Sequence, residues 1–259
     1  MAIINGKGAW GVRRTPVASN GVITSGLILN LDAGSANSYV SGSATWNDIS
    51  GYGNNGTLIN GPTFSSVNGG YIRCDGFDDY ISIPSTSQFK FGSGNFTVEY
   101  WFRKLDTTIW WDNLWGPNAW NTGSSPGTNE WSLGIGNGGN TGEGNYFSFG
   151  VEVGTTAYGT GESATPLNLN TWYQLVGVRE GGNLKVYLNS ALNMSTNPVG
   201  FTSSSVINNV PARTIRLGNS GLNRFYTNVD NSQLRIYNKA LSSAEVLQNY
   251  NTTKTRYGL

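Results

Sequence analysis

The sequence predicts an all-β protein with one short helix near its C-terminus. Glycine makes up 36 of its 259 residues and aromatic residues 12%, whereas only 12% of the residues are charged. Aromatic residues favour strands and glycine favours tight turns, so this balance indicates many short strands instead of long helices. Two polar stretches, 46–58 and 74–81, are rich in Gly, Asn and Asp, which predicts compact corners on a β scaffold.

The expected strands are apolar or alternating runs that end at turn residues. The run 27–31 stops at an Asp-Ala-Gly turn, and 80–83 stops at a proline. In 96–103, apolar side chains recur at every second position from Phe96 to Phe102, so one face of that strand belongs in the core. Further strands are expected at 71–74, 146–153, 172–179, 184–188, 214–217 and 233–237.

Two local sequence signals predict a hairpin and a helix. The glycines at 181 and 182, placed between two alternating runs, predict a tight hairpin. Ser242 followed by Glu245 predicts a capping box, in which each side chain satisfies a free backbone amide of the first helical turn. The apolar stripe of this helix is expected at Val246, Leu247 and Tyr250.

Composition excludes several functions. The net charge of +1 disfavours nucleic-acid binding, which needs clustered Lys and Arg. The absence of histidine excludes Ser/His/Asp and Cys/His nucleophile pairs and histidine metal sites. The single cysteine, Cys74, is expected to be a small buried residue, and no apolar run suggests membrane insertion. The first residues do not resemble a secretory signal, so synthesis in a cytoplasm is expected.

The chain is expected to comprise an N-terminal arm, 1–25, and one domain, 26–259. The arm is rich in Gly, Ser and Asn, and its apolar residues are too scattered for a regular element. It is either a disordered terminus or a segment that a partner or a neighbouring subunit covers, because its apolar side chains are costly to leave in water. The candidate partner contacts of the arm are Ile3, Ile4, Trp10, Arg13 and Arg14.

Five of the nine tryptophans fall within residues 109–131, interleaved with Asn, Asp and Gly. Such a loop is a protein interface, an insertion packed on its own small core, or a glycan platform in which aromatic faces pack on a sugar and amides bond its hydroxyls. All three alternatives stay open. The candidate contact residues are Trp110, Trp111, Asn113, Trp115, Asn118, Trp120 and Trp131.

Five blocks in order, 46–58, 75–81, 96–102, 172–189 and 235–242, resemble the laminin G-like group of concanavalin A-like lectin and glucanase domains. The resemblance covers about residues 26–251. It implies a jelly-roll sandwich of two antiparallel sheets, with ligands held by loops or on the concave sheet. Two shorter stretches, 27–34 and 246–251, are similar to virion proteins of tailed phages that infect aquatic bacteria.

A structural calcium ion is one expectation for the polar corners, with oxygen ligands from Asp48, Asn54, Asp78 and Asp79. The alternative is that these residues form Asx turns and satisfy backbone amides without an ion. Many members of the family carry an acidic residue before the last strand, where this chain has Asn231, Ser232 and Gln233, and this departure weakens the case for calcium.

The expected function is that of a non-enzyme. Glucanases of the resembled superfamily use two glutamates at Glu-x-Asp-x-x-Glu spacing, and none of the seven glutamates here has an acidic partner two or three residues away. The resemblance implies a structural protein of the virion, either decorating the capsid or belonging to a tail appendage. Its partners would be other virion proteins or copies of itself in an oligomer. The alternative is an adhesin for host surface polysaccharide, and a glycoside hydrolase is the third possibility.

Overall fold

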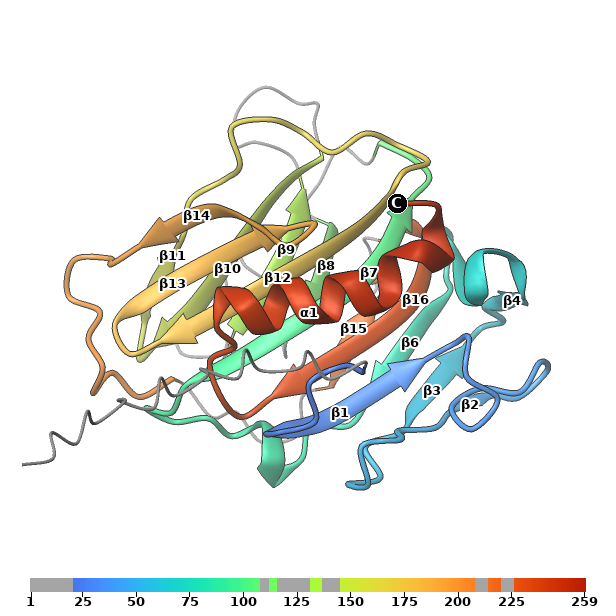
Figure 1. Cartoon of the computed structure of the whole chain (residues 1–259), viewed down its shortest axis with the longest axis horizontal. Helices are drawn as coiled ribbons and strands as arrows, with labels where there is room; N and C mark the ends of the chain where they lie inside the picture. The colour runs from blue at the N-terminus through green and yellow to red at the C-terminus, as the bar shows by residue number, and fades with distance from the viewer. Residues whose placement is uncertain (1–20, 108–111, 116–130, 137–144, 208–213, 220–225) are drawn as a thin grey trace, which may run out of the picture.

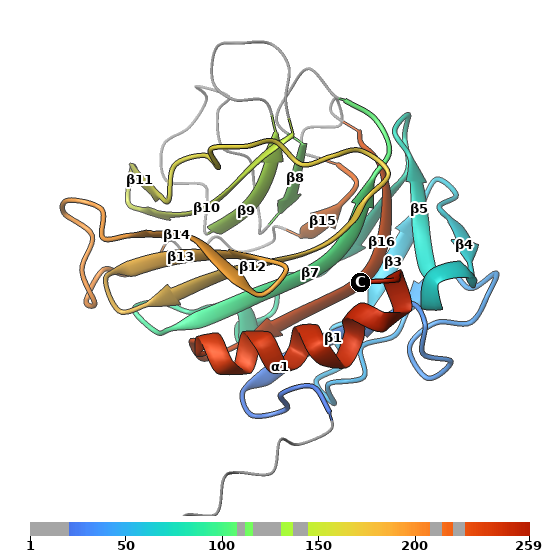
Figure 2. The ribbon, with the colours of Figure 1, turned by 45° about the horizontal axis from the view of Figure 1, so that its top comes forward.

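Two antiparallel β-sheets pack face to face, and one α-helix lies across the outer face of one of them (Figures 1 and 2). The computed structural model describes residues 21–107, 112–115, 131–136, 145–207, 214–219 and 226–259. This architecture confirms the predicted all-β jelly-roll sandwich with a short C-terminal helix. No helix among the described residues is long and apolar enough to span a bilayer.

The sheet beneath the helix, sheet A, has β16 near its centre. One edge of β16 pairs with β7, and the other edge pairs with β5 along its first half and with β1 along its second half. In spatial order the sheet contains β14 (Ala191–Thr196), β13 (Asn183–Leu188), β12 (Trp172–Glu180), β7 (Phe96–Lys104), β16 (Asn228–Tyr237), β5 (Tyr71–Asp75) and β4 (Thr63–Ser65), with β1 (Leu27–Asp32) beside β16.

The second sheet, sheet B, closes the sandwich from the other side. In spatial order it contains β11 (Thr156–Gly159), β10 (Tyr146–Val153), β9 (Trp131–Gly136), β8 (Asp112–Trp115), β15 (Ile215–Leu217), β6 (Tyr80–Ile83), β3 (Gly56–Ile59) and β2 (Thr45–Trp46). Short 3-10 helices are η1 (Val67–Gly69), η2 (Ser87–Phe89) and η3 (Lys254–Tyr257).

The core lies between the two sheets, as the period-two pattern of β7 predicts. Phe96, Val98, Tyr100 and Phe102 are all buried in it. The alternate residues of β7 therefore lie on the outer face of sheet A, under or beside the helix. The sheets approach so closely at Gly177 that a Cβ atom there would lie 2.5 Å from the Phe149 ring, which only glycine avoids.

The predicted hairpin is confirmed, because β12 and β13 are joined by Gly181 and Gly182, and Gly181 has a φ of +58°. Strand β16 begins five residues before the predicted strand at 233. The residues from Asp230 to Ser232 are polar, so this part of the strand shows no hydrophobic pattern in the sequence. In the structure they are nevertheless buried and hydrogen-bonded.

Helix α1 (Ser243–Thr253) begins with the predicted capping box. The backbone amide of Glu245 donates to Ser242 Oγ at 3.3 Å, and the amide of Ser242 donates to Glu245 Oε2 at 2.9 Å. The predicted apolar stripe is wrong at Leu247, which is 46% exposed. Asn249 is buried in its place, because its side-chain amide donates to Glu99 Oε2 at 2.6 Å and to the Tyr237 hydroxyl at 2.9 Å.

The predicted boundary between arm and domain stays a prediction. Ile3, Ile4, Trp10, Arg13 and Arg14 lie outside the described residues. Within residues 21–25, the amide of Ile23 donates to Asn249 Oδ1 at 2.8 Å, and Gln248 Nε2 donates to the carbonyl of Gly21 at 2.8 Å. The described end of this segment is therefore bound to α1.

Candidate functional site

The first polar corner is organised by the Asp48 carboxylate. Its Oδ1 accepts from the amides of Asn30 and Ser50, each at 2.9 Å, and its Oδ2 accepts from the amide of Asn54 at 2.9 Å. The Ser50 hydroxyl donates to the same Oδ2 at 2.8 Å. These bonds are those of an Asx turn, so they favour the alternative in which Asp48 satisfies backbone amides without an ion.

Asn54 has a similar structural role. It is buried, its Nδ2 donates to the carbonyl of Ile28 at 2.9 Å, and its Oδ1 accepts from the Thr86 hydroxyl at 3.0 Å. The amide oxygen proposed as a calcium ligand is therefore already engaged by the protein. This corner joins the start of sheet A to sheet B. The side-chain oxygens of Asp48 and Asn54 already accept hydrogen bonds from the protein, which makes the corner a poor site for a ligand.

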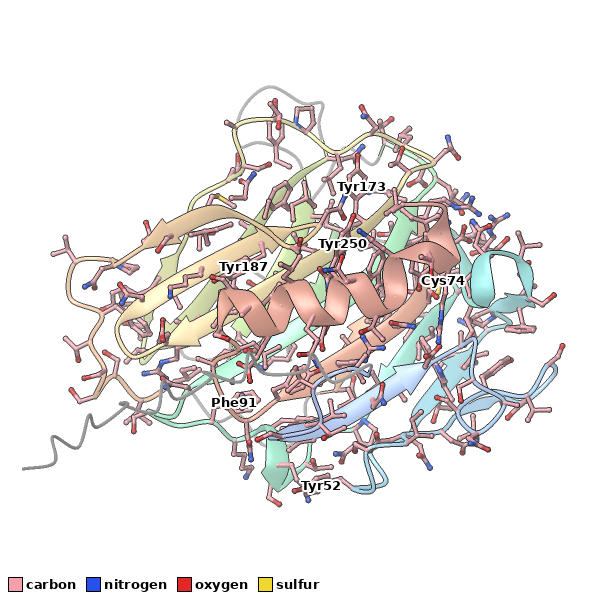
Figure 3. The ribbon with its side chains drawn as sticks, viewed as in Figure 1. Tyr52, Cys74, Phe91, Tyr173, Tyr187 and Tyr250 are labelled. Atoms are coloured by element: carbon pink, nitrogen blue, oxygen red, sulfur yellow. The ribbon has the colours of Figure 1, made fainter. Side chains whose placement is uncertain are left out.

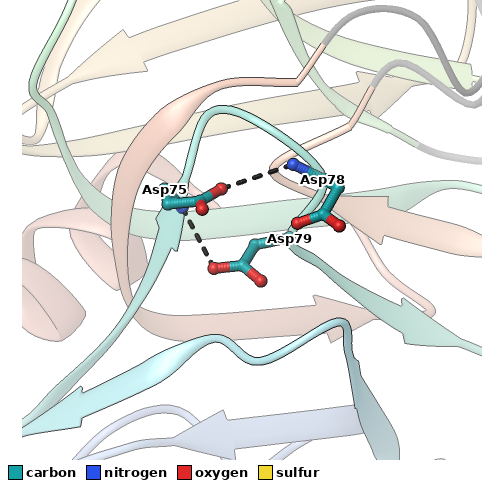
Figure 4. A group of neighbouring side chains, drawn as sticks. All are labelled: Asp75, Asp78 and Asp79. Atoms are coloured by element: carbon teal, nitrogen blue, oxygen red, sulfur yellow. Dashed lines mark hydrogen bonds between the residues drawn. The ribbon is translucent and has the colours of Figure 1, made fainter.

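The second polar corner, residues 75–79, gathers three carboxylates on one turn (Figure 4). Carboxylate oxygens of Asp75, Asp78 and Asp79 lie within 4.8 Å of one another, and this is the one group of its kind in the part of the chain that the structure describes. Sequence reasoning named Asp78 and Asp79 but missed Asp75. We call residues 75–79 the acidic loop.

Hydrogen bonds hold the acidic loop in its shape. Asp75 Oδ1 accepts from the amide of Phe77 at 2.8 Å and from that of Asp78 at 3.4 Å, while Asp79 Oδ2 accepts from the amide of Asp75 at 3.3 Å. Gly76 provides the positive φ of +83° that the turn requires. As a result the ring of Phe77 projects into solvent and is 81% exposed.

The acidic loop has excess negative charge. Burial raises the pKa of Asp79, and the neighbouring Asp75 and Asp78 carboxylates raise it further. The amide of Asp75 acts in the opposite direction. Within the described residues these three carboxylates form no ion pair with Lys or Arg. Such a group suits a hard divalent cation such as Ca²⁺, whose preferred ligands are oxygens.

An aromatic and polar group adjoins the acidic loop on the outer face of sheet B. The Tyr80 and Tyr226 rings have centroids 6.4 Å apart, and the Arg216 guanidinium lies 4.8 Å from the Tyr80 ring. Arg216 Nη1 donates to Asn219 Oδ1 at 3.1 Å, and Asn219 forms a β-bridge with Tyr226. We call these four residues the aromatic patch.

Three observations place the aromatic patch against the acidic loop. Tyr80 directly follows Asp79 at the start of β6, and Asn228, two residues after Tyr226, pairs with Asp75. A Cβ atom on Gly218, next to Asn219, would lie 3.3 Å from the carbonyl of Asp79. The acidic loop and the aromatic patch together are termed the rim site.

The tryptophan loop is described only in part. Trp110, Trp111, Asn118 and Trp120 lie outside the described residues, and of Asn113 and Trp115 the structure describes the backbone, in β8. Trp115 pairs in register with Arg216 of the aromatic patch. The prediction that Trp131 is a contact residue is wrong. Its side chain is 1% exposed and packs in the core against Phe96, so it is not part of the surface.

The buried glutamate of β7 is sealed away from any ligand. Glu99 lies under α1, where it accepts hydrogen bonds from Gln174 Nε2 at 2.8 Å, Arg235 Nη1 at 3.1 Å and Asn249 Nδ2 at 2.6 Å. Glu180 and Glu245 pair with Lys185 and Lys239. None of these glutamates is placed as one half of a glycosidase pair.

Comparison with known proteins agrees with this architecture. Residues 75–247, more than half of the chain, match the family model of the concanavalin A-like lectin/glucanases superfamily, in its laminin G type. A comparison with curated proteins finds no match.

Solved structures with the same fold include two toxin domains and an enzyme. The binding domain of Paraclostridial Mosquitocidal Protein 1 is 15% identical, with a TM-score of 0.63 over 88% of this chain and 52% of that one. The binding domain of botulinum neurotoxin DC in complex with SialylT is 14% identical, with a TM-score of 0.60 over 89% and 52%.

The enzyme is the Trypanosoma rangeli sialidase in complex with the inhibitor DANA, 14% identical, with a TM-score of 0.59 over 88% of this chain and 33% of that one. The chain therefore spans about half of each toxin domain and a third of the sialidase.

Proposed function

The chain belongs to the concanavalin A-like lectin/glucanases superfamily, and on that premise we propose that it is a non-enzymatic domain that binds a glycan at the rim site. One observation carries the proposal: the exposed Phe77 ring stands beside three carboxylates and next to the aromatic patch. A sugar offers a C–H face to an aromatic ring and hydroxyls to carboxylates and amides, so the rim site supplies both components.

The solved structures of the fold support this proposal in general terms. One toxin binding domain was solved with SialylT and the sialidase with DANA. The sialidase also keeps hydrolysis open as an alternative, because two carboxyl groups about 5 Å apart are what a retaining glycosidase needs. In the acidic loop, Asp75 and Asp79 instead accept hydrogen bonds from the amides of their own turn, which favours binding.

The experiment is a glycan array followed by titration calorimetry on the best glycan. Phe77→Ala should weaken binding about 5- to 30-fold, since an aromatic anchor in a small site contributes about 1–2 kcal/mol. Tyr52→Ala is the matched control, because Tyr52 is also an exposed aromatic residue but lies in the first corner, well apart from Cys74 and the acidic loop that follows it (Figure 3). Equal affinities of the two variants would refute the rim as the site.

Hydrolysis of the bound glycan would refute the non-enzymatic part of the proposal. The readout is release of reducing ends during long incubation. Activity lost in both Asp75→Asn and Asp79→Asn would identify a carboxylate pair, whereas no release by the unaltered protein would support binding alone.

A second candidate places the domain on a phage virion, as capsid decoration or a tail appendage. The similarity of residues 27–34 and 246–251 to virion proteins of tailed phages supports it. A glycan-binding rim would serve such a protein as an adhesin for host polysaccharide. Mass spectrometry of purified particles tests the placement, and absence from the particles would refute it.

A further inference from the structure

A row of charged residues crosses the outer face of sheet A, on the opposite sheet from the aromatic patch. Arg73 of β5 pairs in register with Asp230 of β16, Asp230 pairs with Arg103 of β7, and Arg103 pairs with Trp172 of β12. Arg103 alternates with the core residue Phe102, so the row lies on the solvent side of the sheet. We call Arg73 and Arg103 the arginine pair.

One buried carboxylate holds both guanidinium groups. The Asp230 side chain is 0% exposed and accepts from Arg73 Nε at 2.7 Å and Nη2 at 3.1 Å. It also accepts from Arg103 Nε at 2.8 Å, with Arg103 Nη2 at 2.6 Å. Two cations share one anion, so the group keeps a net charge of about +1.

The arginine pair keeps donors for a ligand. In the parts of the chain that the structure describes, neither Nη1 group has a hydrogen-bond partner, and the two side chains are 39% and 20% exposed. A guanidinium offers planar pairs of N–H donors that match carboxylate and sulfate oxygens. The carboxylate lies below the surface and the free donors lie at it.

Aromatic rings fix the arginine pair in place. The Arg103 guanidinium lies 5.4 Å from the Tyr71 ring and 5.1 Å from the Trp172 ring, and the Arg73 guanidinium lies 5.5 Å from Tyr71. The Tyr257 ring of η3 packs on Trp172, with the ring centroids 4.7 Å apart. Side chains held in this way lose little freedom when a ligand binds, which lowers the entropic cost of association.

Two further cations belong to η3, whose Tyr257 contacts Trp172. Arg256 pairs with the buried Asp32 at 2.7 Å, and Lys254 Nζ lies 5.2 Å from the Tyr250 ring. Both guanidinium groups of the arginine pair contact the same Asp230 carboxylate, so their free donors converge on one part of the surface. Such a point suits one carboxylate or sulfate group at a time, like those that recur along an acidic polysaccharide.

We propose that the arginine pair binds the carboxylate or sulfate groups of an acidic polysaccharide. This surface differs from the rim site, and the proposal does not depend on the rim binding a sugar. A polysaccharide is favoured over nucleic acid because the net charge of the chain is only +1, too small for a field that draws in a phosphate backbone.

The test uses polygalacturonate as the carboxylate probe and dextran sulfate as the sulfate probe, with neutral dextran and duplex DNA beside them. Biolayer interferometry measures affinity for each at low and physiological salt. Arg73→Gln should weaken binding of the preferred acidic polymer about tenfold, because each charge-assisted bond contributes on that order. Lys90→Gln, which removes an exposed cation elsewhere, is the matched control and should change nothing.

Removing either arginine alone leaves the buried Asp230 with one cation and can destabilise the fold. The double variant Arg103→Gln/Asp230→Asn removes one charge of each sign. It therefore leaves no unbalanced buried charge, while the guanidinium donors of Arg103 are lost. Binding of either acidic polymer, reduced in Arg73→Gln and in the double variant, supports the proposal. Failure of both polymers to bind, equal loss in Lys90→Gln, or equally tight binding of DNA overturns it.

Discussion

Removing the charge of Glu99 should loosen the C-terminal helix from sheet A. Glu99 is buried beneath α1 and joins three partners from three elements: Gln174 of β12, Arg235 of β16 and Asn249 of α1. In Glu99→Gln the geometry is nearly retained, but the buried Arg235 loses its ion-pair partner. Breaking one half of a buried ion pair costs about 3–5 kcal/mol. A further 1–2 kcal/mol is expected if the amide of Asn249 meets the new amide group.

The assay is urea unfolding monitored by tryptophan fluorescence. We expect Glu99→Gln to reduce the free energy of unfolding by about 3–5 kcal/mol. Glu180→Gln is the control, because it breaks the Glu180 to Lys185 pair at the surface, where such a pair contributes at most about 1 kcal/mol. Amide exchange should also rise first in α1.

A double variant makes the test stricter. Glu99→Gln/Arg235→Gln removes both charges, so it should be less destabilised than the sum of the two single variants. A loss in Glu99→Gln no larger than that in Glu180→Gln would refute the reasoning, since it would mean that the network under the helix contributes no more than a surface pair.

Four further predictions concern the acidic loop and the core. Because the pKa of Asp79 is raised in the folded protein, its protonated form stabilises the fold below about pH 4, and this stabilisation is lost as the pH rises through the folded pKa. Asp79→Asn should therefore raise the melting temperature at about pH 7 but not at about pH 3. If the acidic loop binds calcium, Ca²⁺ should raise the melting temperature of the unaltered protein and not of Asp79→Asn; a melting curve that neither Ca²⁺ nor a chelator shifts would contradict a site there. Gly177→Ala should cost about 1–3 kcal/mol in thermal unfolding, since its Cβ would press on the Phe149 ring, and an unchanged melting temperature would contradict the close packing. Burial raises the pKa of the Cys74 thiol, so a maleimide should label the native protein far more slowly than the urea-unfolded chain, as mass spectrometry can follow.

Elements with strong local signals could be predicted from the sequence. The alternation in β7, the double glycine after β12 and the capping box of α1 each depend on residues close together in the chain. Strands such as β2 and β14 could not, because β2 has only two residues and β14 is mostly exposed, so neither shows a hydrophobic pattern of its own.

The contacts that form the candidate sites could not be predicted from the sequence for a different reason. Asp75 and Phe77 stand in a stretch that the sequence marked as polar, but only the folded turn shows that one carboxylate joins the others and that the ring faces solvent. The aromatic patch and the arginine pair join segments more than 100 residues apart, as in the contact between Arg73 and Asp230. No local pattern encodes such a pairing.

The placement of β1 also determines when the sheet can be completed during synthesis. Leu27 pairs with Tyr237, 210 positions later, and β16 is the strand partner of β1 in the described sheet. An apolar strand near the beginning of the domain must therefore wait for almost the whole chain before its edge is covered. Such long-range pairing makes folding slow and leaves the nascent strand open to aggregation. Chaperone binding during translation should thus concentrate on the segment that contains β1.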